Sequence, residues 1–231
     1  LEGRSNPTIT NSNITYNTYP VDCSAHIPSL VTDNISHNSY NNITVGGYIY
    51  DNVIWPESGS PYIVRDNIYI VDTNKLTIDP GVTIKFDSYK RIQVGTGSTH
   101  RGDLYAVGTK AKRIIFTSNR DDTEGGDTNN DGQATAPAKG NWEYIFFYYL
   151  QTVIFNKLEY CTIKYANYGV YLDDNDNGVT VSHCIIEENH RGIHLQSGAK
   201  GNVEYNEFHN NGYGMYFAGS RSGASVHNND I

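Results

Sequence analysis

Apolar and polar positions alternate along the C-terminal part of the chain in a pattern that recurs at a nearly constant spacing. Four similar segments begin at Leu158, Val181, Val203 and Val226, so their starts lie 23, 22 and 23 residues apart. Each is a short apolar–polar alternation bounded by Gly, Asn and Asp, which predicts β-strands and turns. A fixed period in the low twenties predicts a solenoid, in which each coil buries its apolar side only against its neighbours.

A second alternating piece follows three of these segments, at residues 169–172, 192–195 and 214–217. If coils stack at about 4.8 Å, equivalent residues of successive coils form ladders. Side chains alternate between the two sides of a strand, so two ladders point inward and the row between them points outward. The inward ladders are Val170, Ile193 and Met215, and Leu172, Leu195 and Phe217; the outward row is Tyr171, His194 and Tyr216.

At these residues the chain resembles the right-handed parallel β-helix repeat family of carbohydrate-binding proteins, sugar hydrolases and pectate-lyase-like surface proteins. The resemblance covers roughly residues 60–231. It implies an all-β fold, a right-handed parallel β-helix (solenoid) with coils of about 22–23 residues. It also implies a secreted protein, located outside the cell or on its surface. The fold alone does not assign a function, because it hosts lyases, hydrolases, adhesins and inert spacers.

The rest of the chain fits a single-domain solenoid whose two parts differ in regularity. Residues 1–60 are predicted to form an N-terminal segment and cap of the solenoid, with residues 1–5 read as a cloning scar. Residues 61–231 are predicted to form the parallel β-helix, interrupted by an acidic, glycine-rich loop at residues 119–141. The last coil stops before its second alternating piece, so we expect the fold to continue beyond Ile231, with further domains as a possible continuation.

Composition and charge exclude several classes of function. The net charge is −8 and basic residues do not cluster, which argues against nucleic-acid binding. The chain lacks a run of 18 apolar residues, so we expect no membrane span.

Its three cysteines show no metal-ligand spacing, and Cys161 and Cys184 are predicted to be stacked, buried, inert thiols. Inward asparagine ladders, Asn189 over Asn211 and Asn206 over Asn229, are expected to be structural.

The acidic loop contains the sharpest local motif, in which Asp127, Asn129 and Asp131 alternate before Gly132. This matches the first half of a calcium-binding loop, and Ca²⁺ prefers six to eight oxygen ligands. The glutamate expected at the twelfth position is missing, because Ala138 stands there. The sequence therefore predicts Ca²⁺ as a cofactor bound by Asp127, Asn129 and Asp131, with a solvated acidic loop as the alternative. Further ligands are available from the preceding acidic residues, Asp121, Asp122 and Glu124.

The outward row Tyr171, His194 and Tyr216 is the candidate glycan-binding site, because flat rings in line along a sheet can stack on sugar rings. The alternative is that aromatic residues simply fit a pleated surface. A lyase or hydrolase would need carboxylates or a base nearby, and a hydrolase places its two carboxyls about 5–9.5 Å apart. No motif singles out such a pair. The catalytic candidates are Asp173, Asp174, Glu187 and His194.

Two hypotheses follow for function. In the first, the protein is an extracytoplasmic β-helix that binds or processes polysaccharide or a surface glycan, as a polysaccharide lyase or glycoside hydrolase if it is an enzyme. In the second, it is a non-catalytic structural or adhesin module of a cell-surface protein. Clustered carboxylates beside the Tyr171 row would favour an enzyme, whereas a surface with only ladder contacts would favour a structural role.

Overall fold

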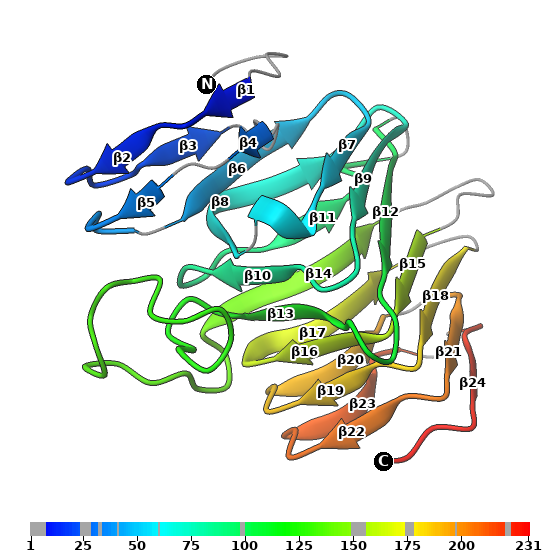
Figure 1. The fold of residues 1–231 in the computed structure, drawn as a ribbon. Coiled ribbons are helices and arrows are strands. Elements are labelled where there is room, and N and C mark those ends of the chain that lie inside the picture. Colours follow the sequence, from blue (N-terminus) through cyan, green and yellow to red (C-terminus); the bar gives the residue numbers. More distant parts are fainter. Residues whose placement is uncertain are drawn as a thin grey trace.

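The computed structural model describes residues 8–23, 29–31, 34–40, 42–59, 61–97, 100–148, 156–173, 178–196, 198–219 and 223–231. Within these ranges the regular elements are β-strands, apart from one short 3-10 turn, η1 (Glu57–Gly59). The paired strands run parallel and stack into a solenoid (Figure 1). The predicted all-β parallel solenoid is therefore confirmed. Among the described residues, no helix is long and apolar enough to cross a membrane.

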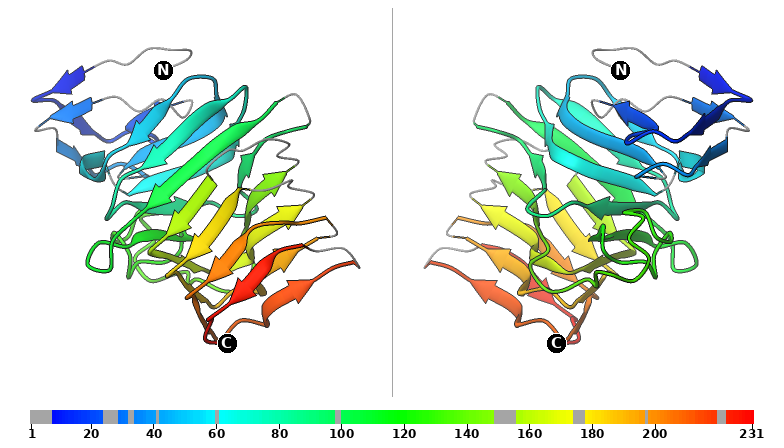
Figure 2. Two further views of the ribbon diagram at one scale, coloured as in Figure 1. Left: turned by 90° about the vertical axis from the view of Figure 1, so that its right-hand side faces the viewer. Right: turned by 90° about the vertical axis from the view of Figure 1, so that its left-hand side faces the viewer.

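Each regular coil contributes one strand to each of three faces, which the side views in Figure 2 show as stacked ladders of arrows. The loop face consists of β3 (Val21–Cys23), β10 (Thr83–Phe86), β13 (Ile114–Ser118), β16 (Cys161–Lys164), β19 (Ile185–Glu187) and β22 (Glu207–His209), with the first halves of β6 (Ile43–Ile49) and β8 (Tyr62–Ile70). The tyrosine face consists of the second halves of β6 and β8, with β11 (Ile92–Val94), β14 (Trp142–Tyr148), β17 (Ala166–Asp173), β20 (Arg191–Leu195) and β23 (Tyr213–Phe217).

The third face consists of β7 (Val53–Trp55), β9 (Asn74–Ile78), β12 (Gly102–Val107), β15 (Asn156–Glu159), β18 (Val179–Ser182), β21 (Asn202–Glu204) and β24 (Ser225–His227). Two small parallel pairs precede them, β1 (Thr8–Thr10) with β4 (Ser29–Val31) and β2 (Asn13–Thr15) with β5 (Asn34–Ser36). The predicted N-terminal segment thus contains parallel strands of its own. Because β6 pairs with β8, the sheet continues from the predicted N-terminal segment into the predicted β-helix.

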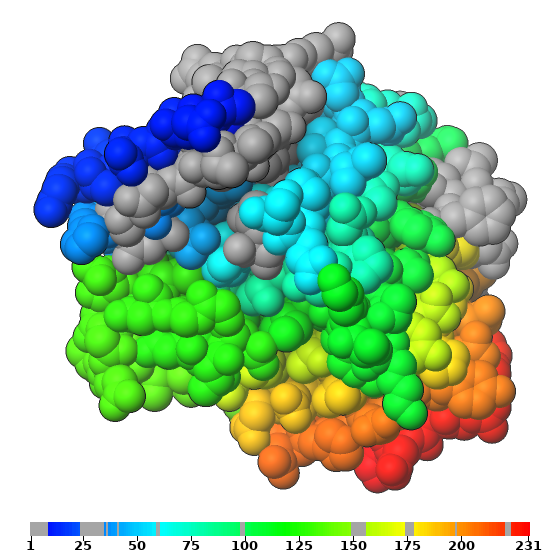
Figure 3. Space-filling model, viewed as in Figure 1, coloured from blue at the N-terminus to red at the C-terminus, as the bar shows by residue number. Residues whose placement is uncertain are grey.

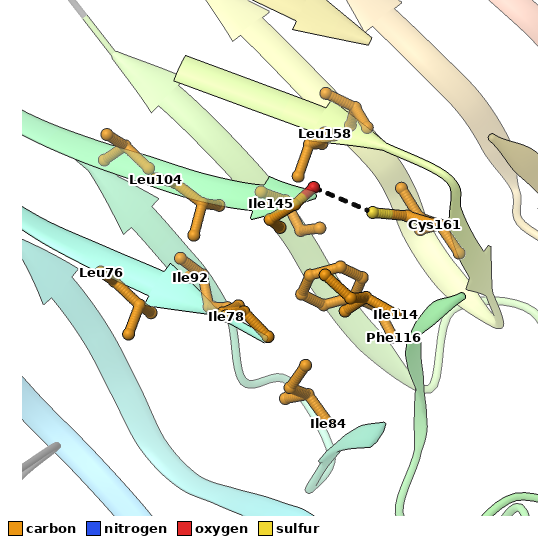
Figure 4. Close-up of a cluster of buried hydrophobic side chains, with 14 of the residues drawn as sticks. Leu76, Ile78, Ile84, Ile92, Leu104, Ile114, Phe116, Ile145, Leu158 and Cys161 are labelled. Carbon is orange, nitrogen blue, oxygen red and sulfur yellow. Dashed lines mark hydrogen bonds between the residues drawn. The ribbon is translucent and has the colours of Figure 1, made fainter. Parts of the chain in front are cut away.

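The ladder register agrees with the spacing of the repeats. Val170 pairs with Ile193, which pairs with Met215, and Leu172, Leu195 and Phe217 form the next ladder. Inward aliphatic and aromatic side chains from all three faces fill a continuous core, part of which Figure 4 shows around Ile145 and Phe116. Burying each large aliphatic side chain contributes about 1.5–3 kcal/mol, so stacking of coils is the main source of stability.

The last coil departs from the expected burial. Leu195 is fully buried, whereas Phe217 in the same ladder is 55% exposed. The reason is its position, because β23 is the edge strand of the tyrosine face and no described strand covers its far side. An apolar ladder is buried only where a coil lies on both sides of it.

The predicted asparagine ladders and buried thiols are present. Asn189 Nδ2 donates to Asn211 Oδ1 at 3.0 Å, and Asn206 Nδ2 donates to Asn229 Oδ1 at 3.0 Å. Cys161 and Cys184 are buried and free, and burial raises the pKa of the Cys161 thiol well above its usual value. The Cys161 thiol donates to the carbonyl of Ala106 at 3.5 Å (Figure 4). Both thiols are therefore structural groups in the core.

Candidate functional site

Two outward rows of mainly aromatic residues run across the tyrosine face. The predicted row of Tyr171, His194 and Tyr216 is part of a longer one, whose members in order are Tyr48, Tyr69, Gln93, Phe146, Tyr171, His194 and Tyr216. A second row, which the sequence analysis missed, comprises Tyr144, Tyr168, Arg191 and Tyr213. The signal for it was present, since Tyr168, Arg191 and Tyr213 recur at the coil spacing.

Rings of the first row pack on one another along the solenoid axis. Tyr171 stacks on Phe146 with ring centroids 4.5 Å apart and 22° between the planes, and its other neighbour, His194, lies at 4.6 Å. Tyr48 and Tyr69 are stacked in the same way at 4.8 Å. The faces of Tyr171 are thus used within the protein. In this conformation a sugar cannot stack on these ring faces as the sequence predicted. The ring edges and hydroxyl groups remain accessible to a ligand.

His194 differs most from its predicted role, because the side chain is only 6% exposed. Arg191 Nη1 lies 2.9 Å from its Nδ1, and its Nε2 lies 3.3 Å from Gln196 Oε1. A guanidinium can only donate, so Nδ1 accepts and Nε2–H donates to Gln196. Burial lowers the pKa of His194, and the Arg191 charge lowers it further. Both nitrogens of this neutral imidazole are therefore occupied, which argues against His194 as a base or a glycan ligand.

Besides its contact with His194, Arg191 packs against two tyrosine rings. Its guanidinium lies 3.9 Å from the ring centroid of Tyr216 and 4.8 Å from that of Tyr168. Such contacts add about 0.5–1 kcal/mol each where they are exposed to solvent. Arg191, Tyr168 and Tyr216 therefore form a cluster that covers His194 and fixes the surface at this point.

The other catalytic candidates lie apart. Asp173 is the last residue of β17 on the tyrosine face, whereas Glu187 is the last residue of β19 on the loop face, in register with Lys164. Two carboxyls on different faces of the coil cannot flank one glycosidic bond. Asp174 falls outside the described residues. Among the described candidates, the structure thus separates the carboxyls of Asp173 and Glu187.

The acidic loop between β13 and β14 is fastened to the loop face by two buried lysines (Figure 3 shows the loop at the lower left). Lys85 is fully buried, and its Nζ donates to the carbonyl of Gly126 at 2.6 Å. Lys164 Nζ lies 3.0 Å from both Asp121 Oδ2 and Glu124 Oε1. Burial lowers the pKa of Lys85 to about 8, which neighbouring carboxylates only partly oppose. Sequence reasoning did not connect either lysine with the acidic loop.

These lysines neutralise part of the charge that suggested calcium, but a cluster of acids remains. Asp122, Asp127 and Asp131 each place a carboxylate oxygen within 4.8 Å of the others. Burial raises the pKa of Asp122, and the charges of Asp127 and Asp131 raise it further. Repulsion of this kind is relieved by a cation or by proton uptake.

The predicted ligands shape the loop around this cluster. Asp127 accepts hydrogen bonds from the amides of Asp131 at 3.1 Å and Gly132 at 2.8 Å, and Asn129 Nδ2 donates to Asp131 Oδ2 at 2.7 Å. Three buried oxygens in this loop have no hydrogen-bond partner among the described residues: Asp122 Oδ1, Asn129 Oδ1 and Asp131 Oδ1. Unpaired oxygen acceptors are the donor set that a hard cation such as Ca²⁺ prefers, so the residues present fit the predicted ion.

Comparison with known proteins agrees with the fold. Residues 140–231 match the family described as Right handed beta helix region. Over 83 residues, 36% of this chain, the sequence is 40% identical to Protein bark beetle of Drosophila melanogaster, and the match spans 2% of the length of that protein. No solved structure matches the chain. The predicted resemblance to the right-handed parallel β-helix family is confirmed. This match does not assign a function to the chain, which has to be argued from the candidate site.

Proposed function

We propose that this right-handed β-helix protein is an extracellular or cell-surface binding module that holds a polysaccharide or surface glycan against its tyrosine face. The observation that carries the proposal is the pair of aromatic rows across successive coils. Tyr48 is 45% exposed and Tyr213 is 58% exposed. Within the described residues, the hydroxyls of Tyr171, Tyr213 and Tyr216 form no hydrogen bond with the protein. Phenol groups both donate and accept, as sugar hydroxyls do.

Coil geometry suits an extended polymer. Equivalent residues recur at about 4.8 Å, so alternate coils present the same group about 10 Å apart, close to the length of a disaccharide. Each tyrosine would contribute weakly through its hydroxyl and ring edge. Weak contacts on successive coils act on one tethered chain, so affinity is expected to grow with glycan length.

Binding is favoured over processing by the placement of the candidate residues. Asp173 and Glu187 lie on different faces of the coil, and His194 is buried with both nitrogens paired. A lyase needs an available base, and a hydrolase needs two carboxyls on one bond. The described candidate residues meet neither requirement, so binding is the better proposal.

An adhesin module with a protein partner is the second candidate, and a specific observation favours it. The rings of the tyrosine face stack on one another and are interspersed with Arg91 and Arg191; the Arg91 guanidinium lies 5.6 Å from the ring centroid of Tyr144. Tyrosine and arginine are enriched at the centres of protein interfaces, where lysine and glutamate are depleted. This candidate uses the same face and differs only in the partner.

We also propose Ca²⁺ as a structural ion of the acidic loop. Asp122, Asn129 and Asp131 would hold it through their unpaired oxygens, with Asp127 beside them. When bound, the ion supplies positive charge that relieves carboxylate repulsion. The loop residues themselves fix the turn, because Asp127 accepts two backbone amide hydrogen bonds regardless of the ion.

A binding experiment separates these proposals. The protein is screened on a glycan array, and each hit is titrated as a series of oligomers of increasing length. We expect affinity to rise with length and to fall at least fivefold in Tyr213→Ala with Tyr216→Ala. Tyr205→Ala is the matched control, because Tyr205 is 50% exposed but lies outside the tyrosine face. Absence of any glycan hit would overturn the glycan proposal and leave the adhesin candidate.

A further inference from the structure

A polar cleft of about 420 Å³ opens between the N-terminal coils, the ends of β10 and β13, and the acidic loop. Its volume lies within the range of small-molecule sites. In Figure 3 the acidic loop lies directly below the N-terminal coils on this side of the molecule. Its lining includes Tyr40, Asp87, Ser88, Lys90, Asn119 and Arg120. None of these residues belongs to the aromatic rows of the tyrosine face.

One carboxylate, that of Asp87, lines the cleft, and only one of its two oxygens accepts a hydrogen bond from a described side chain. Asn119 Nδ2 donates to Asp87 Oδ1 at 2.9 Å, and Asp87 Oδ2 accepts no hydrogen bond from a described residue. Burial raises the pKa of Asp87, while Asn119, Arg65 and Lys90 oppose this rise. A partly desolvated carboxylate with a free oxygen is a strong acceptor for a ligand hydroxyl.

Two cations, Lys90 and Arg120, also line the cleft. Lys90 Nζ is 3.8 Å from Asp66 Oδ1, in a pair whose aspartate side chain is 77% exposed. Such an exposed contact contributes little and is readily exchanged for a ligand. The guanidinium of Arg120 forms no hydrogen bond or ion pair with any described residue. The lining therefore carries one more positive than negative charge, although the whole protein has a net charge of −8.

Neutral polar groups complete the lining. Burial raises the pKa of Tyr40, so its phenol stays protonated and able to donate. Ser88 is exposed, and its side chain offers a hydroxyl group. A cationic spot in an acidic protein concentrates small anions locally. The surrounding hydroxyl, amide and carboxylate groups match a ligand that also carries hydroxyls.

We propose that this cleft binds a small monoanion that carries one carboxylate and several hydroxyl groups. Arg120 and Lys90 bind the ligand carboxylate, with the forked guanidinium suited to a two-point contact. Asp87 and Tyr40 bind the ligand hydroxyls. Sugar acids and open-chain hydroxy acids share this chemistry, and both fit the volume. The site is independent of the glycan proposed for the tyrosine face.

Isothermal titration of the whole protein at low salt tests the proposal with defined probes. Glucuronate and gluconate represent a ring and an open-chain hydroxy acid, glucose lacks the carboxylate, and acetate lacks the hydroxyls. We expect at least one of the two hydroxy acids to bind, at least tenfold more tightly than either glucose or acetate. Preference for glucuronate identifies a sugar-acid site, and preference for gluconate identifies a site for open-chain acids. Raising the salt concentration should weaken binding, because the contact is between charges.

Variants locate the binding in the cleft. Arg120→Gln and Asp87→Asn should each reduce affinity at least tenfold, while Lys110→Gln, which removes an exposed cation outside the cleft, should leave it unchanged. Unchanged melting temperatures show that the variants fold. The proposal is overturned if neither hydroxy acid binds at millimolar concentration, if acetate binds as tightly as both, or if Arg120→Gln binds like the parent. Variants of Tyr213 and Tyr216 should not affect this site, so its failure and that of the glycan proposal are distinguishable.

Discussion

Arg191 and His194 lie three positions apart in β20, and the 2.9 Å contact between Nη1 and Nδ1 fixes both the tautomer and the charge of the histidine. The imidazole must accept, so it stays neutral, and its lowered pKa follows from burial and from the adjacent guanidinium. A residue that alternation places on the outward side is thus buried beneath Arg191, Tyr168 and Tyr216. This relationship makes the tyrosine face sensitive to acid.

The first prediction concerns that sensitivity. In the folded protein the pKa of His194 lies below its ordinary value of 6.5, so the unfolded chain binds the proton more readily. The stability that neutral His194 contributes is present above pH 6.5 and is lost as pH falls through the folded pKa. Melting temperatures measured from pH 7.5 to 4.5 should therefore decline more steeply for the parent than for His194→Gln. His209→Gln, which removes an exposed histidine, should decline like the parent.

The second prediction concerns Lys85 beneath the acidic loop. Its folded pKa of about 8 lies below the ordinary value of 10.5, so between these values the unfolded chain holds a proton that the folded protein has released. Stability from this group therefore rises with pH in that window, by up to ~1.4 kcal/mol per pH unit. Denaturant unfolding from pH 7.5 to 10.5 should show the parent gaining stability relative to Lys85→Met. A constant difference between the two proteins would contradict the buried position of this ammonium.

The third prediction tests the calcium proposal. Ca²⁺ added after chelation should raise the melting temperature of the parent in a concentration-dependent way, because an ion that binds only the folded state stabilises it by about 2.7 kcal/mol at 100 times Kd. Asp127→Ala with Asp131→Ala should abolish the shift. Glu204→Ala with Glu207→Ala removes the same charge from the last coils and should retain it. A parent protein that melts at one temperature with and without Ca²⁺ would exclude the ion.

The fourth prediction concerns glycan contact by the first aromatic row. Tyr171→Ala with Tyr216→Ala should weaken binding of long glycans by roughly 1 kcal/mol, about fivefold, for each tyrosine hydroxyl removed, the usual net contribution of one hydrogen bond. Both positions point outward, so the inward ladders stay intact and the protein should remain folded by circular dichroism. Short oligomers, which reach fewer coils, should be less affected than long ones. Equal affinity of variant and parent for long glycans would move the contact elsewhere.

The fifth prediction compares two positions of one ladder. Leu195 is fully buried, so Leu195→Ala should cost about 2–5 kcal/mol in the free energy of unfolding through lost burial and a cavity. Phe217 is the next member but is 55% exposed, so Phe217→Ala should cost less than half as much. Denaturant unfolding of both variants gives the comparison. Similar losses for both would show that Phe217 is covered in solution.

The sequence by itself determined the stacking of coils. Residues 22 or 23 apart carry the same side-chain type in a strand of period 2, and this places Val170 beside Ile193. A slip of one residue would expose every apolar group of the coil, so the pattern allows a single register. The ladder of Asn189 and Asn211 follows from the same spacing. These features are local and repeat, which is why the sequence suffices for them.

Only the tertiary structure decided the chemistry of the surface, because that chemistry depends on contacts that do not repeat from coil to coil. Alternation correctly places His194 on the outward side, but Tyr168, Tyr216 and Arg191 of this and adjacent coils bury it. Lys85 and Lys164 meet the acidic loop 41 and 40 residues away in the chain, at positions without periodic signal. A ladder is specified by spacing alone, whereas desolvation, tautomer and charge depend on which side chains the folded chain brings together.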